Sequence, residues 1–90
     1  MYTKQTTIIN KTGLHARPAS DFVLLAKRFS SKVTIRNADQ AGEPVNAKSI
    51  LRLLAESIGQ GVKVEIAADG SDETDAVEQL VALLESGFGE

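Results

Sequence analysis

The sequence contains no cysteine and a single histidine among its 90 residues. Without cysteine the chain can form neither a disulfide nor a thiolate metal site, and thiol catalysis is excluded. With one histidine and no cysteine, the ligand set of a typical metal site is missing. We therefore expect no metal and no cofactor. A small domain without cysteine also suits a reducing cytoplasm, where we expect the protein to act.

Excess positive charge and long apolar runs are also missing. Ten basic and twelve acidic residues give a net charge of -2, whereas nucleic-acid-binding domains are normally basic. The first ten residues, MYTKQTTIIN, lack the apolar core of a signal peptide. No apolar run approaches the length of a membrane span. The composition predicts a protein that binds no nucleic acid and inserts into no membrane.

Apolar periodicity predicts four strands and three helices. Alternating or β-branched segments favour strands at 2–9, 32–36 and 62–67, and the residues VNA after Pro44 favour a short edge strand. Apolar residues at helical spacing predict helices at 16–29, at 50–58 and from about Asp72 to Gly87. The order strand, helix, strand, strand, helix, strand, helix is typical of a two-layer α+β fold, with helices on one face of an antiparallel sheet. No linker or repeat divides the chain, so we expect one domain over 1–90.

The histidine, His15, lies in the segment NKTGLHARPAS, directly before the first predicted helix. A lone loop histidine is often a surface residue or a helix cap without chemistry, and no G-x-S-x-G motif supports a catalytic triad. Pro18, however, fits only the first helical turn, whose free N–H groups can bind an anion. Arg17 adds a guanidinium suited to phosphate oxygens, and imidazole can act as a nucleophile. This setting predicts reversible phosphorylation of His15.

The segment GLHARPAS resembles the active-site signature of the HPr family, the phosphocarriers of the bacterial phosphoenolpyruvate-dependent sugar phosphotransferase system. VNAKSI at 45–50 resembles the second signature of that family, and GSDETDAVEQL and GFGE resemble its last helix and tail. The resemblance covers nearly all of the chain. It departs at NADQAGEP, which is longer than is common in the family. We expect the additional residues in an exposed hairpin loop, where extra length costs little.

The resemblance implies an open-faced β-sandwich, with a four-stranded antiparallel sheet in the order 1-4-2-3 covered by three helices on one face. It implies that His15 accepts a phosphoryl group on Nδ1 from enzyme I and passes it to sugar-specific IIA domains. Arg17 then stabilises the phosphoryl group, and the backbone amides of Ala16 and Arg17 donate to it. The protein is thereby expected to be a phosphocarrier and not an enzyme in its own right, and a monomer.

Ser49 precedes the second predicted helix, where serine is a preferred N-cap. The resemblance implies a second role, phosphorylation by a dedicated serine kinase, with a phosphorylase to reverse it and a catabolite-repression regulator as partner. The same helix presents more apolar residues than one face can bury. The resemblance implies a partner-docking surface there, to which we assign Lys27, Lys48, Ile50, Leu51 and Leu54.

Two alternatives remain open from the sequence. The first is a carrier in a nitrogen-related regulatory phosphotransfer chain, which the residues do not distinguish from sugar uptake. The second is a purely regulatory interaction module of the same fold. Modules of that kind lack the active histidine, so the presence of His15 with Arg17 argues against the second alternative.

Overall fold

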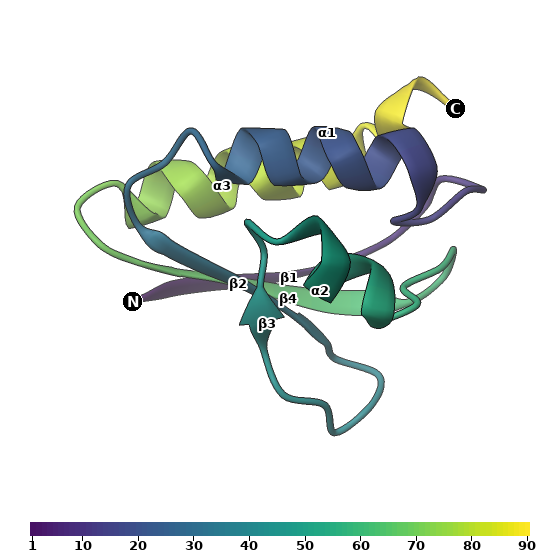
Figure 1. Ribbon diagram of the computed structural model, residues 1–90, viewed down its shortest axis with the longest axis horizontal. Helices are drawn as coiled ribbons and strands as arrows, with labels where there is room; N and C mark the ends of the chain where they lie inside the picture. The colour runs from purple at the N-terminus through teal and green to yellow at the C-terminus, as the bar shows by residue number, and fades with distance from the viewer.

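The computed structural model describes residues 1–90 as four strands, three α-helices and a terminal 3-10 turn. In chain order they are β1 (Tyr2–Thr7), α1 (Ala16–Ala26), β2 (Lys32–Asn37), β3 (Val45–Asn46), α2 (Ile50–Ala55), β4 (Lys63–Asp69), α3 (Glu73–Glu85) and η1 (Gly87–Gly89). The sheet has the order β1-β4-β2-β3, and every neighbouring pair is antiparallel. Figure 1 shows α1 and α3 side by side along one face of the sheet, with α2 next to α1. The predicted fold class and strand order are confirmed.

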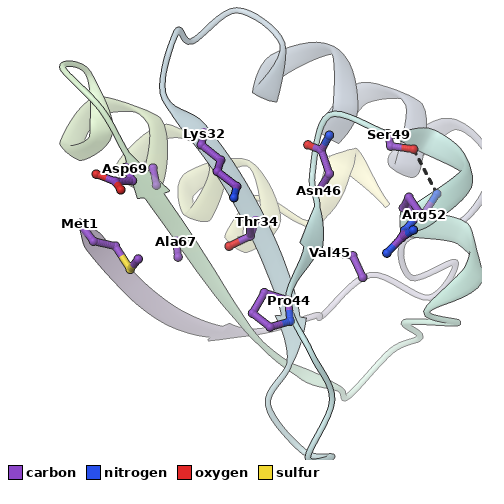
Figure 2. A pocket seen from close by; sticks show the side chains of 11 residues that line it. Met1, Lys32, Thr34, Pro44, Val45, Asn46, Ser49, Arg52, Ala67 and Asp69 are labelled. Carbon is purple, nitrogen blue, oxygen red and sulfur yellow. Dashed lines mark hydrogen bonds between the residues drawn. The ribbon is translucent and has the colours of Figure 1, made fainter.

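The core lies on the helix side of the sheet because the central strands alternate. In β2, Val33 and Ile35 are fully buried, whereas Lys32 and Thr34 are on the opposite, solvent-facing side (Figure 2). β4 alternates in the same way, as expected when successive side chains point to opposite faces. The helices complete the core with fully buried apolar side chains, among them Phe22, Leu53 and Leu80. One face of the sheet is therefore left uncovered.

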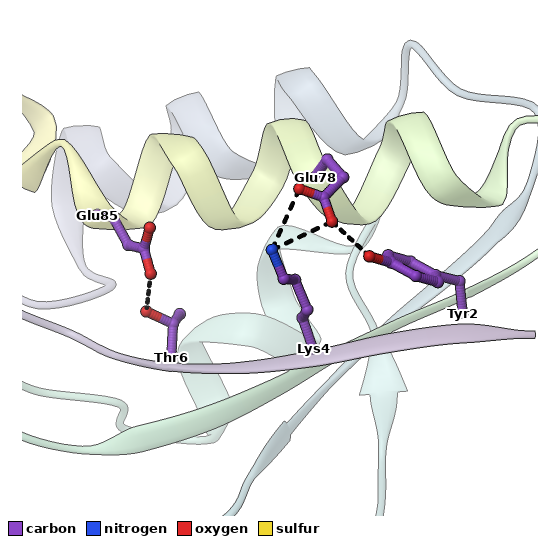
Figure 3. Close-up of polar contacts among 5 residues, drawn as sticks. All are labelled: Tyr2, Lys4, Thr6, Glu78 and Glu85. Carbon is purple, nitrogen blue, oxygen red and sulfur yellow. Dashed lines mark hydrogen bonds and ion pairs between the residues drawn. The ribbon is translucent and has the colours of Figure 1, made fainter.

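Polar contacts join edge strand β1 to α3 (Figure 3). The Tyr2 hydroxyl donates to Glu78, Lys4 Nζ lies 3.1 Å from the same carboxylate, and Thr6 Oγ1 donates to Glu85 at 3.0 Å. The Tyr2 hydroxyl and the Lys4 ammonium together hold the pKa of Glu78 below its ordinary value. These contacts position a strand that contains no aliphatic residue, YTKQTT.

Two helices end earlier than the sequence predicts. α1 stops at Ala26, and Arg28 and Phe29 make i to i−3 bonds to Leu25 and Ala26. The next amides, those of Ser30 and Ser31, donate to Asp72 at 2.9 Å instead of continuing the helix.

α2 stops at Ala55, and Ser57 has a left-handed backbone with φ of 52°. This conformation is typical of helix ends, and it leaves Ile58 buried outside the helix. The connection between β2 and β3 is an exposed hairpin loop, as expected, with Asp39, Gln40 and Ala41 in solvent. No helix has the length and apolar character required to cross a bilayer.

Candidate functional site

The loop that carries His15 is anchored to the core by its own backbone. The side-chain amide of Asn10 donates to the carbonyl of Gly13 at 3.0 Å, and the Gly13 N–H returns a bond to the Asn10 carbonyl at 3.2 Å. The Leu14 N–H donates to the carbonyl of Ile58 at 2.9 Å, and the Leu14 side chain is fully buried. The residue directly before His15 is therefore fixed on both its backbone and its side chain.

Gly13 allows this loop to approach the chain that follows α2. Its φ is +71°, a left-handed conformation that glycine adopts at little cost. A Cβ at this position would lie 2.7 Å from Gly59 Cα and 2.8 Å from the Ile58 carbonyl oxygen, both of them backbone atoms. A side chain at position 13 would consequently separate the His15 loop from its support.

The C-terminal residue adds an anchor that the sequence does not predict. The Thr12 N–H donates to Glu90 Oε1 at 3.0 Å. Hydrogen bonds from Thr12, backbone first, with smaller contributions from Asn10 and Lys11, lower the pKa of Glu90. Asn10 and Gly13 carry the Asn-x-x-Gly signal of a tight turn, but no local pattern connects Glu90 with Thr12.

His15 is the N-cap of α1, as the sequence predicts, with φ −133° and ψ 166°. Its side chain makes no capping hydrogen bond and is only half-buried, so the imidazole is not committed to stabilising the helix. Arg17 is exposed in the first turn, and Pro18 is buried in the same turn. The N–H groups of a first turn have no intrahelical acceptor. The site therefore combines a reachable imidazole, free backbone donors and one guanidinium.

Ala16, directly after His15, has a φ of +50°. Positive φ is uncommon for residues other than glycine, and it costs about 1–2 kcal/mol for an L-residue. The surrounding anchors hold this conformation. Neither composition nor periodicity predicts it, because a helix-forming alanine at the start of a helical pattern carries no signal of a left-handed backbone.

Ser49 is the N-cap of α2, as predicted. Its Oγ accepts a hydrogen bond from the Arg52 N–H at 3.3 Å, shown as a dashed line in Figure 2. The Ser49 carbonyl accepts from the Leu53 N–H at 3.0 Å. The side chain is half-buried, so its hydroxyl still reaches the surface.

Helix α2 extends from the far end of α1 back to the His15 loop. At its start, Lys48 Nζ donates to the carbonyl of Phe29, just beyond α1, at 2.7 Å. Beyond its end, Ile58 accepts from Leu14, next to His15. Residues of α2 therefore lie between Ser49 and the His15 loop.

The predicted docking residues divide into two groups. Leu51 is 77% exposed, and Ile50 and Leu54 are each 37% exposed, so all three present apolar surface on α2. Lys27 is also exposed. Lys48, in contrast, is half-buried and its ammonium is bonded to Phe29. Lys48 thus has a structural contact that the sequence did not indicate, and its role in docking stays a prediction.

No group of three or more His, Asp or Glu side chains is arranged to hold a metal ion.

Comparison with known proteins identifies the family. The family model described as the phosphorylation site of the PTS HPr component matches residues 2–86. The chain is 46% identical to the phosphocarrier protein HPr of Haemophilus influenzae, over 93% of this chain and 95% of that protein. It is 44% identical to the HPr-like protein Crh of Halalkalibacterium halodurans, over 94% and 98% of the two chains. A crystal structure of HPr from Thermoanaerobacter tengcongensis superposes with a TM-score of 0.93, at 44% identity, over 100% of this chain and 98% of that one. The chain belongs to the HPr family, the phosphocarrier proteins of the phosphotransferase system.

Proposed function

We propose that His15 carries the phosphoryl group, accepting it from enzyme I on Nδ1 and giving it to sugar-specific IIA domains. The observation that supports this most strongly is the uncommitted imidazole at the start of α1, beside Arg17. In loading, the bond between phosphorus and the donor breaks as the Nδ1–P bond forms. In unloading, the Nδ1–P bond breaks as the IIA acceptor takes the group. Both steps need an accessible ring and no deep substrate pocket.

Arg17 and the first-turn amides then stabilise the transferred group. The guanidinium supplies planar donors that match phosphate oxygens. The N–H groups of Ala16 and Arg17 are at the positive end of the α1 dipole, which favours negative charge. These donors are in place before transfer, because the Asn10–Gly13 turn and the Leu14 bond hold the loop. Such preorganisation avoids rearrangement when charge arrives.

The remaining assignments follow from this role. Residues 1–90 act as one domain, and the protein works in the cytoplasm as a monomer without a cofactor, since each transfer partner supplies its own reactive group. Sugar uptake through the phosphotransferase system is the process that we assign to it.

The test is phosphorylation in solution. The protein is incubated with phosphoenolpyruvate and enzyme I, and its intact mass is measured before and after brief acid treatment. We expect one added phosphoryl group that acid removes, and none in His15→Ala, whose fold should persist because His15 makes no capping bond. If His15→Ala is still loaded, the assignment is wrong.

We further propose that phosphorylation of Ser49 regulates docking. A phosphate on Ser49 would place a dianion at the start of α2, next to the exposed Ile50 and Leu51. On docking, that charge has to be desolvated, and it repels an acidic partner surface. Because α2 extends from Ser49 to the His15 loop, a partner that reaches His15 across α2 also passes this phosphate. A serine kinase, a matching phosphorylase and a catabolite-repression regulator are the corresponding partners.

Substitution separates this role from helix capping. Ser49→Asp retains a good N-cap, so the melting temperature should hardly change while the affinity for enzyme I falls. Ser49→Ala should lose some helix stability and keep its affinity. Enzyme I is titrated against both variants and against the serine-phosphorylated protein. Equal affinities for the unmodified and phosphorylated forms would leave Ser49 as a cap only.

A further inference from the structure

The uncovered face of the sheet contains a hollow of ≈ 720 Å³ beside the start of α2. Figure 2 shows Thr34 of β2 at its centre, between Ala67 of β4 and the strand β3, with Lys32 and Asp69 on one side and Arg52 on the other. Small-molecule sites typically enclose about 300–1,000 Å³, so this hollow has the size of one. The core, against which α1 packs, is on the other side of the sheet. The hollow is therefore on the opposite face from α1, the helix whose N-cap is His15.

Small side chains create the hollow. Ala67 is in the middle of the solvent-facing side of β4, where register places it between Thr3 of β1 and Thr34 of β2. Longer side chains surround these positions, and Lys32 and Asp69 occupy opposite register positions at the end of the β2–β4 ladder without forming a salt bridge. The floor is therefore low and partly apolar, and the rim carries the charges.

The rim carries two cations without a carboxylate partner. Lys32 and Arg52 take part in no salt bridge, whereas Arg36 on the same face is paired with Glu65 at 3.4 Å. Asp69 is the only carboxylate that lines the hollow. The local balance favours an anionic ligand, because an incoming anion would gain attraction without breaking an existing ion pair.

Neutral donors next to the cations are also free. Asn46 uses its Oδ1 to accept from the Lys48 N–H at 2.9 Å, which leaves its amide NH₂ available. Ser49 uses its Oγ as an acceptor from the Arg52 N–H, which leaves its O–H to donate. Thr34 adds a half-buried hydroxyl. These groups suit a ligand with an anionic end and several hydroxyl groups.

We propose that this hollow is a binding site for a small phosphorylated polyol. The phosphate is held by Arg52, by the Ser49 hydroxyl and by Lys32. The hydroxyl groups contact Thr34, Asn46 and Asp69 above the floor made by Ala67. The site is distinct from His15, so binding requires no phosphoryl transfer.

The test follows amide chemical shifts of the ¹⁵N-labelled protein during titration with glucose 6-phosphate, with glucose, and with inorganic phosphate. We expect saturable shifts in β2, β3 and the start of α2, and a dissociation constant for glucose 6-phosphate about tenfold below that for either fragment. Shifts confined to the His15 loop, or no saturable shift with glucose 6-phosphate, would overturn the proposal.

Substitutions test whether glucose 6-phosphate binds in the hollow. Ala67→Ile fills the floor with a residue that favours strands, and Arg52→Ala removes one cation; each should weaken glucose 6-phosphate binding by about tenfold or more. Lys63→Ala is the matched control, because it removes a cation from the exposed side of β4 outside the hollow, and it should change the affinity less than about twofold. Equal losses in Arg52→Ala and Lys63→Ala would indicate general charge attraction and would refute the site. Thermal melts confirm that each variant is folded.

Discussion

Substitution of Gly13 by alanine tests how the His15 loop is supported. The native φ of +71° costs an alanine about 1–2 kcal/mol. The new Cβ also meets Gly59 Cα at 2.7 Å and the Ile58 oxygen at 2.8 Å, so backbone must move. Overpacking of this kind typically costs about 1–3 kcal/mol. Together the two effects predict that Gly13→Ala lowers the free energy of unfolding by about 2–5 kcal/mol.

Gly61→Ala is the matched control for this prediction. Gly61 has a φ of +88°, but no atom lies within 4 Å of its would-be Cβ. Gly61→Ala should therefore lower the free energy of unfolding only by the cost of the left-handed backbone, about 1–2 kcal/mol. Urea unfolding measures both variants, and the rate of phosphorylation by enzyme I, per folded molecule, should fall only for Gly13→Ala. If the two variants lose equal stability, the close approach of Gly13 to Gly59 does not support the loop.

Three further predictions concern single side chains. Arg17→Glu should slow phosphoryl loading and unloading by about tenfold or more, which corresponds to a rise of about 1.4 kcal/mol in the activation free energy. The melting temperature should stay unchanged. An unchanged transfer rate in stopped-flow assays would remove Arg17 from the site. Asp72 has a pKa lowered to about 2 by the Ser31 hydroxyl and the Ser30 N–H. Its contribution to stability is complete above about pH 4 and is lost as the pH falls toward 2. Asp72→Asn should flatten the dependence of the free energy of unfolding on pH between about pH 4 and pH 2. Parallel pH dependences for the two proteins would contradict this. Lys48→Met removes the bond to Phe29 and should cost about 0.5–1.5 kcal/mol in urea unfolding, whereas exposed Lys27→Met should cost almost nothing; equal losses would show that the bond does not stabilise the fold.

Local patterns predict the element order, and they predict that His15, Arg17 and Pro18 lie at the start of α1. Alternation in KVTIR and VKVEIA depends on period two, and the helices depend on apolar spacing, so each is visible in a short window. His15, Arg17 and Pro18 are adjacent in the chain, which is why their joint position at the start of α1 can be predicted. Periodicity does not predict the strand order. Only the resemblance to the HPr family indicated it.

Features that depend on distant contacts could not be predicted. The chain that follows α1 is held by Asp72, about forty positions away, which accepts from the Ser30 and Ser31 amides. Thr12 depends on Glu90, 78 residues further along the chain. No local pattern encodes such pairs, since they exist only after the sheet has formed.

The hollow on the uncovered face also depends on residues that are distant in sequence. It arises from the register that places Ala67 opposite Thr34, and register between strands distant in sequence is a property of the assembled sheet. The left-handed backbone of Ala16 is likewise set by its surroundings and not by the preference of alanine.

The most direct test of the central claim uses the fact that the chain has one histidine. Labelling histidine with ¹⁵N gives NMR signals from one imidazole only, that of His15. These signals are recorded before and after addition of phosphoenolpyruvate and a catalytic amount of enzyme I, while mass spectrometry follows phosphoryl incorporation in the same sample. We expect a shifted Nδ1 resonance that is coupled to phosphorus. The intensity of this signal should grow in proportion to the gain in mass. A protein that gains a phosphoryl group while both ring nitrogens stay unchanged would carry that group elsewhere, and His15 would not be the carrier.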